Sequence, residues 1–231
     1  MPLAPRIITT TITTMTEAAA VMRLLTWLSP AFPTGAFAYS HGLEWAVETH
    51  DIRDGETLRA WLDDVIAHGA ARTDTILLRQ AHRAAADPGP LRDIAALARA
   101  TAASRERYGD ATAQGEAFRR AAAGWGVPEL PDDTPYAVAV GAMAGAHGID
   151  EDCAASAYLQ TFVSNLISAA VRLVPLGQTT GLAVLATLEA SILRTAAATR
   201  DATLDDLGGC AFRSDLAAMR HETQYTRLFR S

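Results

Sequence analysis

The sequence predicts an all-α fold, a single-domain helical bundle of about nine helices, and three observations support this prediction. About a fifth of the 231 residues are alanine, the strongest helix former, while only 6% are aromatic. Apolar residues recur three and four positions apart through most of the chain, as they do on the buried face of a helix. The sequence has no signature of a β-hairpin, a fixed-period repeat or a coiled coil.

The first half of the chain contains six segments with helical spacing, separated by residues that cap or break helices. Thr16 and Asp54 are expected N-caps, and Pro88-Gly89-Pro90 separates two helices. The six segments span 17–28, 39–48, 54–66, 73–86, 91–98 and 105–123. Residues 29–37 contain two prolines and a glycine among apolar side chains, which predicts a packed loop.

The second half contains four further helical segments after a loop at 124–135 that is rich in glycine and proline. They span 136–147, 150–173, 179–199 and 203–208. The loop is a candidate boundary between two sub-bundles. Gly141 and Gly145 lie on a small-residue surface that another helix can approach closely. The acidic residues at 150–152 favour a helix start, because they complement the positive end of the helix dipole.

The expected organisation is a mobile N-terminal arm at 1–16, a helical domain at 17–213 and a C-terminal partner-docking tail at 214–231. The tail places arginines beside Tyr225, Leu228 and Phe229, and arginine and aromatic residues are enriched at interface hot spots. The other interpretation is a final helix packed on its own domain. Because chain ends are seldom part of a core, we expect removal of residues 225–231 to leave the fold nearly intact.

Composition and charge exclude several classes of function. All 20 basic residues are arginine, so the chain has no lysine for a Walker A loop or a Schiff base. The net charge of −6 argues against nucleic-acid binding. Arg172, Glu189 and Arg194 interrupt the longest apolar stretches, so no membrane span is expected. Two distant cysteines and no secretion signal indicate a cytoplasmic protein.

The sequence shows little sign of catalytic chemistry, and we expect no enzyme activity. The six histidines lack metal-ligand spacing, so no metal site is predicted. Ser40 lies in a region without a strand, so it is not a nucleophile elbow. Cys153 and Cys210 are interpreted as small buried hydrophobes, because neither has a neighbouring group that would activate it.

Three short stretches together resemble the UreF family of urease accessory proteins. The first is Pro33-Thr34-Gly35-Ala36-Phe37-Ala38-Tyr39-Ser40 with Gly42-Leu43-Glu44 and Ala46-Val47-Glu48, which is similar to the family's N-terminal signature. The second is the break between two long apolar helices, where Arg172 is followed by Pro175-Leu176-Gly177-Gln178. The third is the tail from Met219 to Ser231.

The resemblance implies a helical, non-catalytic chaperone in nickel delivery to apo-urease. It implies bridging of two partners, the GTPase UreG and the scaffold UreD (also called UreH), in two-fold assemblies that predict a homodimer. It implies no cofactor of its own, since nickel and GTP act through the partners. Glu44 is implicated in control of the GTPase. The expected partner-binding residues are Phe37, Tyr39, Ser40, Glu44, Arg172, Pro175, Gly177, Gln178, Arg220, His221, Gln224, Tyr225, Arg227, Leu228, Phe229 and Arg230.

Two alternatives remain open from the residues themselves. The first is an all-α small-molecule-binding protein or enzyme with a pocket near Phe37, in which His41 and Glu44 form an acid–base pair three residues apart on a helix. The second is a self-associating bundle with Gly141 to Gly145 as its dimer face. For Glu44 itself, the options are a functional residue presented on a helix ridge and an ordinary solvated charge.

Overall fold

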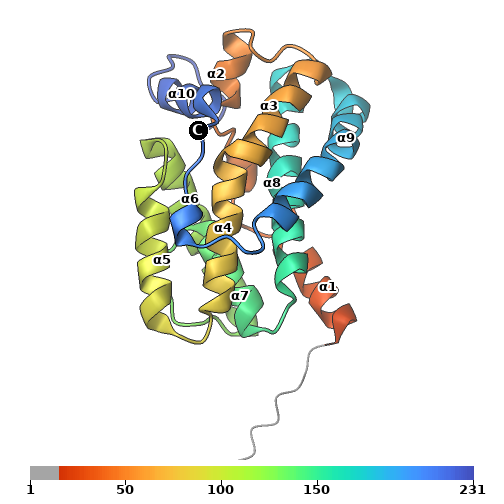
Figure 1. The fold of residues 1–231 in the computed structure, drawn as a ribbon. Coiled ribbons are helices and arrows are strands. Elements are labelled where there is room, and N and C mark those ends of the chain that lie inside the picture. The colour runs from red at the N-terminus through yellow and green to blue at the C-terminus, as the bar shows by residue number, and fades with distance from the viewer. Residues whose placement is uncertain (1–15) are drawn as a thin grey trace, which may run out of the picture.

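The structure is a computed structural model that describes residues 16–231, and within these residues it contains helices and no strands (Figure 1). The predicted all-α class is therefore confirmed, and the described part of the chain holds ten α-helices. The predicted N-terminal arm lies outside the described residues except for Thr16. The Thr16 hydroxyl accepts a hydrogen bond from the backbone of Ala19 and caps the first helix, as expected.

The ten α-helices are joined by short loops and by three short 3₁₀ helices. The α-helices are α1 (Glu17–Trp27), α2 (Leu43–Glu48), α3 (Gly55–His68), α4 (Ala70–Arg83), α5 (Pro88–Ala100), α6 (Arg105–Ala121), α7 (Tyr136–Ala146), α8 (Glu151–Leu173), α9 (Gly177–Ala198) and α10 (Phe212–His221). The 3₁₀ helices are η1 (Ala36–Ala38), η2 (Ala122–Trp125) and η3 (Leu204–Asp206). The expected boundary between residues 213 and 214 falls inside α10.

The centre of the bundle is α7, whose residues 137–144 are all buried. It packs tightly against α4, because Gly141 and Gly145 bring the two backbones together. A Cβ atom at Gly141 would lie 2.1 Å from the carbonyl oxygen of Leu78, and one at Gly145 would lie 2.2 Å from that of His82. The predicted close approach is therefore intramolecular, and the prediction that this surface is a dimer face is wrong.

One hydrophobic core extends through the described chain, from Leu24 in α1 to Phe229 near its end. The helices on both sides of the loop at 124–135 contribute to it, so this loop does not separate two sub-bundles. Phe229 is 5% exposed and belongs to the core. The expectation that residues 225–231 can be removed without affecting the fold is therefore contradicted.

The segment before α2 differs from the expected helix at 39–48. His41 and Gly42 have φ angles of 56° and 81°, so the helix begins only at Leu43. Gly42 is required there, since a Cβ atom would lie 2.5 Å from the backbone nitrogen of Ala218 in α10. Tertiary contact with α10 thus overrides the local helical pattern.

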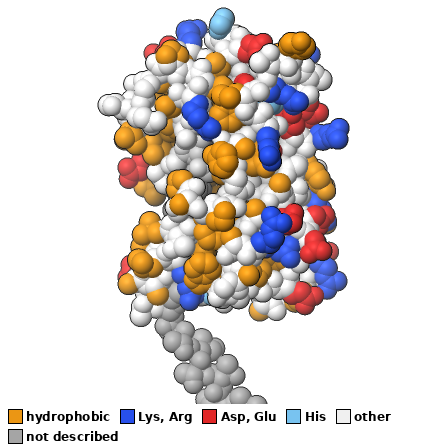
Figure 2. Space-filling view, turned by 180° about the vertical axis from the view of Figure 1, so that it is seen from behind, with side chains coloured by type: hydrophobic (Ala, Val, Ile, Leu, Met, Phe, Trp, Pro, Cys, Tyr) orange, Lys and Arg blue, Asp and Glu red, His pale blue; other side chains and the backbone are white. Residues whose placement is uncertain are grey.

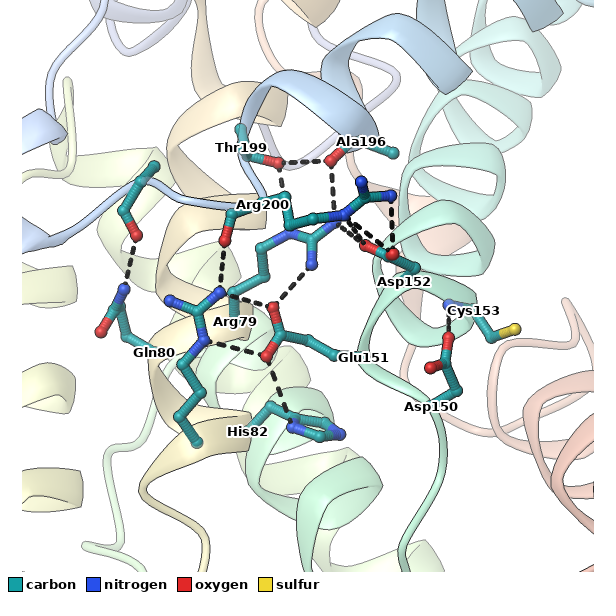
Figure 3. A network of polar contacts seen from close by, with 12 residues as sticks. Arg79, Gln80, His82, Asp150, Glu151, Asp152, Cys153, Ala196, Thr199 and Arg200 are labelled. Atoms are coloured by element: carbon teal, nitrogen blue, oxygen red, sulfur yellow. Dashed lines mark hydrogen bonds and ion pairs between the residues drawn. The ribbon is translucent and has the colours of Figure 1, made fainter.

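The start of α8 is fixed to α4 and α9 by a network of arginines and carboxylates (Figure 3). Arg79 is fully buried, and its guanidinium donates to Glu151 at 2.6 Å, to Asp152 at 2.7 Å and to the carbonyl of Ala196 at 2.7 Å. Arg200 donates to Asp152 at 3.0 Å. The acidic residues that favour the helix start therefore also join three helices, which is the multi-partner geometry that a guanidinium supports.

Two further observations concern exposure. Cys153 and Cys210 are both exposed, so their interpretation as buried hydrophobes is wrong. Among residues 16–231, α9 is long and apolar enough to cross a membrane by length and composition, with a mean hydropathy of 1.3. The core helix of a soluble protein passes the same test, and α9 packs against α8 and α3 and carries Glu189 and Arg194.

Candidate functional site

The three motif stretches, far apart in the sequence, meet on one side of the bundle. Arg172, in the last turn of α8, connects them: its guanidinium donates to the carbonyl of Phe37 at 2.8 Å and lies 4.4 Å from the ring centroid of Phe229. The backbone of Arg230 donates to the carbonyl of Ala38 at 2.8 Å. Arg172 thus joins the N-terminal loop to the tail through a charge-assisted hydrogen bond and a cation–π contact.

The end of the described chain is bound to the segment before α2. The backbone nitrogen of Ser40 donates to the carbonyl oxygen of Ser231 at 2.6 Å, and the Ser40 hydroxyl donates to the same oxygen. The Ser231 hydroxyl donates to the carboxylate of Asp110 in α6. Burial raises the pKa of the Asp110 carboxyl from its usual value of 3.8 to about 6. Ser40, a predicted site residue, therefore anchors the tail.

Glu44 lies under the tail and holds its backbone. Its carboxylate is buried in the first turn of α2 and accepts hydrogen bonds from the backbone nitrogens of Leu228 at 2.6 Å and Phe229 at 2.9 Å. The same carboxylate lies 3.3 Å from Nε2 of His221. Glu44 is therefore neither presented on an exposed ridge nor an ordinary solvated charge.

Two more acidic side chains hold the other end of the tail. Glu106 of α6 lies 2.7 Å from Nδ1 of His221 and accepts a hydrogen bond from Arg227 at 2.8 Å. Glu48 accepts one from the side chain of Gln224 at 2.6 Å. His221 is fully buried between two carboxylates, where its polar ring atoms are satisfied. The predicted residues His221, Gln224 and Arg227 thus contact this chain's own body.

The remaining predicted residues differ in where they point. Large apolar side chains face solvent at Phe37, which is 71% exposed, at Leu228, which is 68% exposed, and at Tyr225, which is fully exposed. Arg220 and Arg230 are exposed beside them in the sequence, and Tyr39 is buried. The turn into α9 is exposed as well, and it contains Pro175, Gly177 and Gln178. Among the described residues, no hydrogen bond joins these three to the tail.

Glu48, Glu106 and Asp110 all hold the tail, although none of them was among the expected partner-binding residues. Glu48 belongs to the N-terminal motif, whereas Glu106 and Asp110 lie outside all three motifs. The one available signal is that Glu106 and Asp110 are four residues apart and so share a face of α6. Such spacing is common on solvated helices, and it does not indicate a distant partner. These residues could be found only once the tail had been placed.

The pocket expected near Phe37, His41 and Glu44 is not formed as predicted. An internal cavity exists and is lined by Tyr39 and His41, but neither Phe37 nor Glu44 lines it. Burial lowers the pKa of His41 well below its usual value. Because the Glu44 carboxylate is occupied by the tail, it forms no acid–base pair with His41. Within residues 16–231, no group of three or more His, Cys, Asp and Glu side chains is placed to hold a metal ion.

Comparison with known proteins agrees with the three motifs. The model of the UreF family matches residues 52–189. The chain is 49% identical to urease accessory protein UreF of Rhodopseudomonas palustris strain BisB18, over 93% of both chains. It is 50% identical to the protein of the same name from Mesorhizobium japonicum, over 92% of this chain and 96% of the relative. It is 52% identical to that of Bradyrhizobium diazoefficiens, over 93% of both chains. With half of its residues shared over nearly its whole length, this chain belongs to the UreF family of urease accessory proteins.

Proposed function

We propose that this protein is a non-catalytic chaperone of urease maturation that bridges the GTPase UreG and the scaffold UreD/UreH during nickel insertion into apo-urease. Family membership supports the role in maturation. The lack of lysine supports a division of labour, because a chain without a P-loop lysine must obtain GTP hydrolysis from a partner. Nickel and GTP then act through the partners, in the cytoplasm, and this chain needs no cofactor of its own.

The observation that carries the proposal is the surface formed by the N-terminal loop, Arg172 and the tail. Its inner side is fixed by the buried hydrogen bonds between Ser40 and Ser231 and between Phe229 and Glu44, while Phe37, Tyr225 and Leu228 project outward. Large apolar side chains held rigidly beside arginines are the composition of interface hot spots, since little conformational entropy is lost when a partner binds them. We assign this surface, here called the docking face, to UreD/UreH.

The role proposed for Glu44 follows from its position beneath the docking face. Because its carboxylate holds the backbone of Leu228 and Phe229, it sets where the outward side chains stand. We propose that Glu44 influences the GTPase cycle of UreG through this positioning, without contacting UreG itself. Pro175, Gly177 and Gln178, exposed at the turn into α9, are proposed to extend the same contact region.

We also propose that the protein forms a homodimer. Its interface must lie elsewhere than at Gly141 to Gly145, because these residues pack against α4 of the same chain. Figure 2 shows hydrophobic side chains reaching the surface over much of the rear of the molecule, with charged side chains gathered towards one edge. Three exposed hydrophobic side chains are close together on α1, within two turns of this helix: Val21, Met22 and Leu25. We propose that α1 contributes to self-association, because such a cluster is unusual on a monomer.

The docking face is tested by co-expression of the chain with UreD/UreH and size-exclusion chromatography with light scattering. We expect the double variant Tyr225→Ala, Leu228→Ala to lose at least about tenfold in affinity, as hot-spot truncations do. Both side chains are exposed, so the melting temperature should not change. The matched control is Tyr108→Ala, Leu193→Ala, an exposed tyrosine of α6 and an exposed leucine of α9. Wild-type binding by the first variant, or equal losses in both, would exclude the docking face. The same runs report the mass of the free protein.

A further inference from the structure

A cavity of about 170 Å³ lies inside the bundle, and its lining includes Ala36 and Tyr39 of the N-terminal loop but none of the outward residues Phe37, Tyr225 and Leu228. Its walls come from α3, α4, α6, α8 and α10, and its apolar lining includes Trp61, Leu77 and Leu166. The lining also includes exposed residues, Thr101, Gly208 and Gly209, which place an opening between the end of α5 and the segment before α10. A single buried water needs only about 10–15 Å³ by this kind of measure, so the space suits a small molecule.

Arg107 is the positive group of this cavity. It lies in the first turn of α6 and lines the cavity, and no carboxylate of the described residues lies within 4.0 Å of its guanidinium. Its charge nevertheless acts on several groups around the cavity, because it opposes the rise in pKa that burial causes at Asp74 and Asp215. A partly buried guanidinium without an ion pair is unusual, since desolvation is costly unless a partner compensates.

The negative groups lie on two other walls. Asp74 of α4 lines the cavity and accepts a hydrogen bond from the Tyr158 hydroxyl at 2.9 Å. Asp215 of α10 lines it too, and no cationic side chain of the described residues lies within 4.0 Å of its carboxylate. The cavity is therefore lined by one positive and two negative side chains from three different helices, and no two of opposite charge lie within 4.0 Å of each other.

Neutral polar groups of the cavity lining also lack protein partners. The side chains of Gln114, Tyr136 and Asn165 line the cavity and make no hydrogen bond to other described residues. Nδ1 of His41 is buried without a partner. Each such group costs free energy unless water or a ligand binds it, so their gathering in one cavity indicates an occupant with several polar atoms. Convergent polar groups in a largely apolar pocket are typical of a small-molecule site.

We infer that this cavity binds a small zwitterion of amino-acid size. Its carboxylate is bound by Arg107, its ammonium group lies against Asp74 and Asp215, and its aliphatic part packs on Leu77 and Leu166. A molecule with both charges matches the unpaired charges of the lining, whereas a simple carboxylate or a simple amine would leave one sign of charge uncompensated. The inference is independent of the docking face and of the proposed role in urease maturation.

Amide NMR titration of the full chain tests the inference with three probes of equal shape. L-Valine carries both charges, 3-methylbutanoate carries only the carboxylate, and 2-methylpropylammonium carries only the amine. We expect saturable shifts with L-valine at amides lining the cavity, and at least about tenfold weaker binding of each half-probe. Arg107→Met should weaken L-valine binding by about tenfold, while Arg59→Met, an exposed arginine of α3, should not change it.

The second variant, Asp215→Asn, covers the case in which Arg107→Met fails to fold, as judged by circular dichroism. It should weaken L-valine and the amine but leave the binding of 3-methylbutanoate unchanged. The inference is overturned if L-valine gives no saturable shift up to its solubility, which would indicate a cavity filled with water only. It is also overturned if either half-probe binds as tightly as L-valine, or if neither folded variant weakens L-valine.

Discussion

Glu44 shows how one side chain can attach a terminal segment to a bundle. Its carboxylate contacts three groups, the backbone nitrogens of Leu228 and Phe229 and the ring of His221. Glu48, one turn later on α2, is exposed and bonds only the side chain of Gln224. The two glutamates share a helix and both contact the tail, so they form a matched pair that compares a buried anchor of the tail backbone with an exposed anchor of one side chain.

Replacement of Glu44 is therefore expected to release the tail. Glu44→Ala should lower the free energy of unfolding by about 2–3 kcal/mol, because the buried backbone donor of Phe229, the partly buried one of Leu228 and the ring of His221 lose their acceptor. Urea unfolding measures this loss, and faster trypsin cleavage at Arg227 and Arg230 reports the release. In the complex, GTP turnover by UreG should change together with the cleavage rate.

The comparison is Glu48→Ala, which removes only the hydrogen bond from the Gln224 side chain, while that side chain still donates to the carbonyl of Thr226. It should lower the free energy of unfolding by about 1 kcal/mol or less and raise the cleavage rate less than Glu44→Ala does. Glu44→Gln should restore part of the stability, since its amide oxygen can still accept one of the two backbone hydrogen bonds. If Glu44→Ala altered GTP turnover while the tail stayed protected, Glu44 would act on UreG by another route than the tail.

At the scale of elements, the contact between α4 and α7 depends on the absence of side chains. Gly141 meets the carbonyl of Leu78, and Gly145 meets that of His82, so the two helix backbones touch. Gly109, in the second turn of α6, has no atom within 4 Å of the position where a Cβ would stand. The same substitution therefore has opposite consequences in two helices.

Gly141→Ala should destabilise the fold by about 3 kcal/mol, because a methyl group at this position forces the helices apart. Gly109→Ala should instead stabilise it by about 0.5–1 kcal/mol, since alanine loses less conformational entropy in a helix. Urea unfolding of both variants measures the difference. A stable Gly141→Ala variant with an altered oligomeric mass would mean that this face is exposed after all.

The elements were more predictable than their contacts. Thr16, Asp54 and Asp150 cap helices as their sequence context predicts, because capping is local chemistry. The start of α2 was mispredicted because Gly42 responds to α10, which lies far away in the sequence. The small-residue surface of α7 was predicted, but composition cannot distinguish a helix of the same chain from a second copy.

The candidate site was predictable as a set of segments and not as an arrangement. The motif stretches were identified from the sequence, and the structure brings the N-terminal loop, Arg172 and the tail together. The division of the tail into anchoring and outward residues could not be predicted. Phe229 and Leu228 are adjacent and both apolar, yet one is buried and the other exposed, because the bent backbone that directs both N–H groups to Glu44 turns only one of the two side chains into the core.

At the scale of the whole molecule, the tail closes the bundle across α2, α6 and α8. Asp110 holds the Ser231 hydroxyl from the α6 side, and burial raises its pKa to about 6. In the unfolded chain the carboxyl has its usual value of 3.8. Between these pH values the folded protein retains a proton that the unfolded chain has lost. The contribution of Asp110 to the free energy of unfolding therefore falls as the pH rises from about 4 to about 6, and it stays lower above that range.

Asp110→Asn should remove this dependence, because its amide oxygen still accepts the Ser231 hydroxyl and never ionises. We expect the variant to be more stable than the wild type at pH 7 by about 1–3 kcal/mol and equally stable at pH 4. Urea unfolding at both pH values measures the difference, with Asp64→Asn, an exposed carboxyl of α3, as the control. A stability gain that is the same at both pH values would contradict ionisation as its cause.

The hydrogen bond between Ser40 and Ser231 joins positions 191 residues apart, which matters for a chain made from one end. At about 5–20 residues per second, a ribosome needs on the order of ten to forty seconds to synthesise the sequence between them. Throughout that time the nascent chain has no tail to cover Glu44. A product of premature termination lacks Tyr225 and Leu228 and the contacts that orient them. Within the proposed function, a chain that stops before Tyr225 therefore presents no docking face, because the outward side chains and the contacts that orient them are both missing.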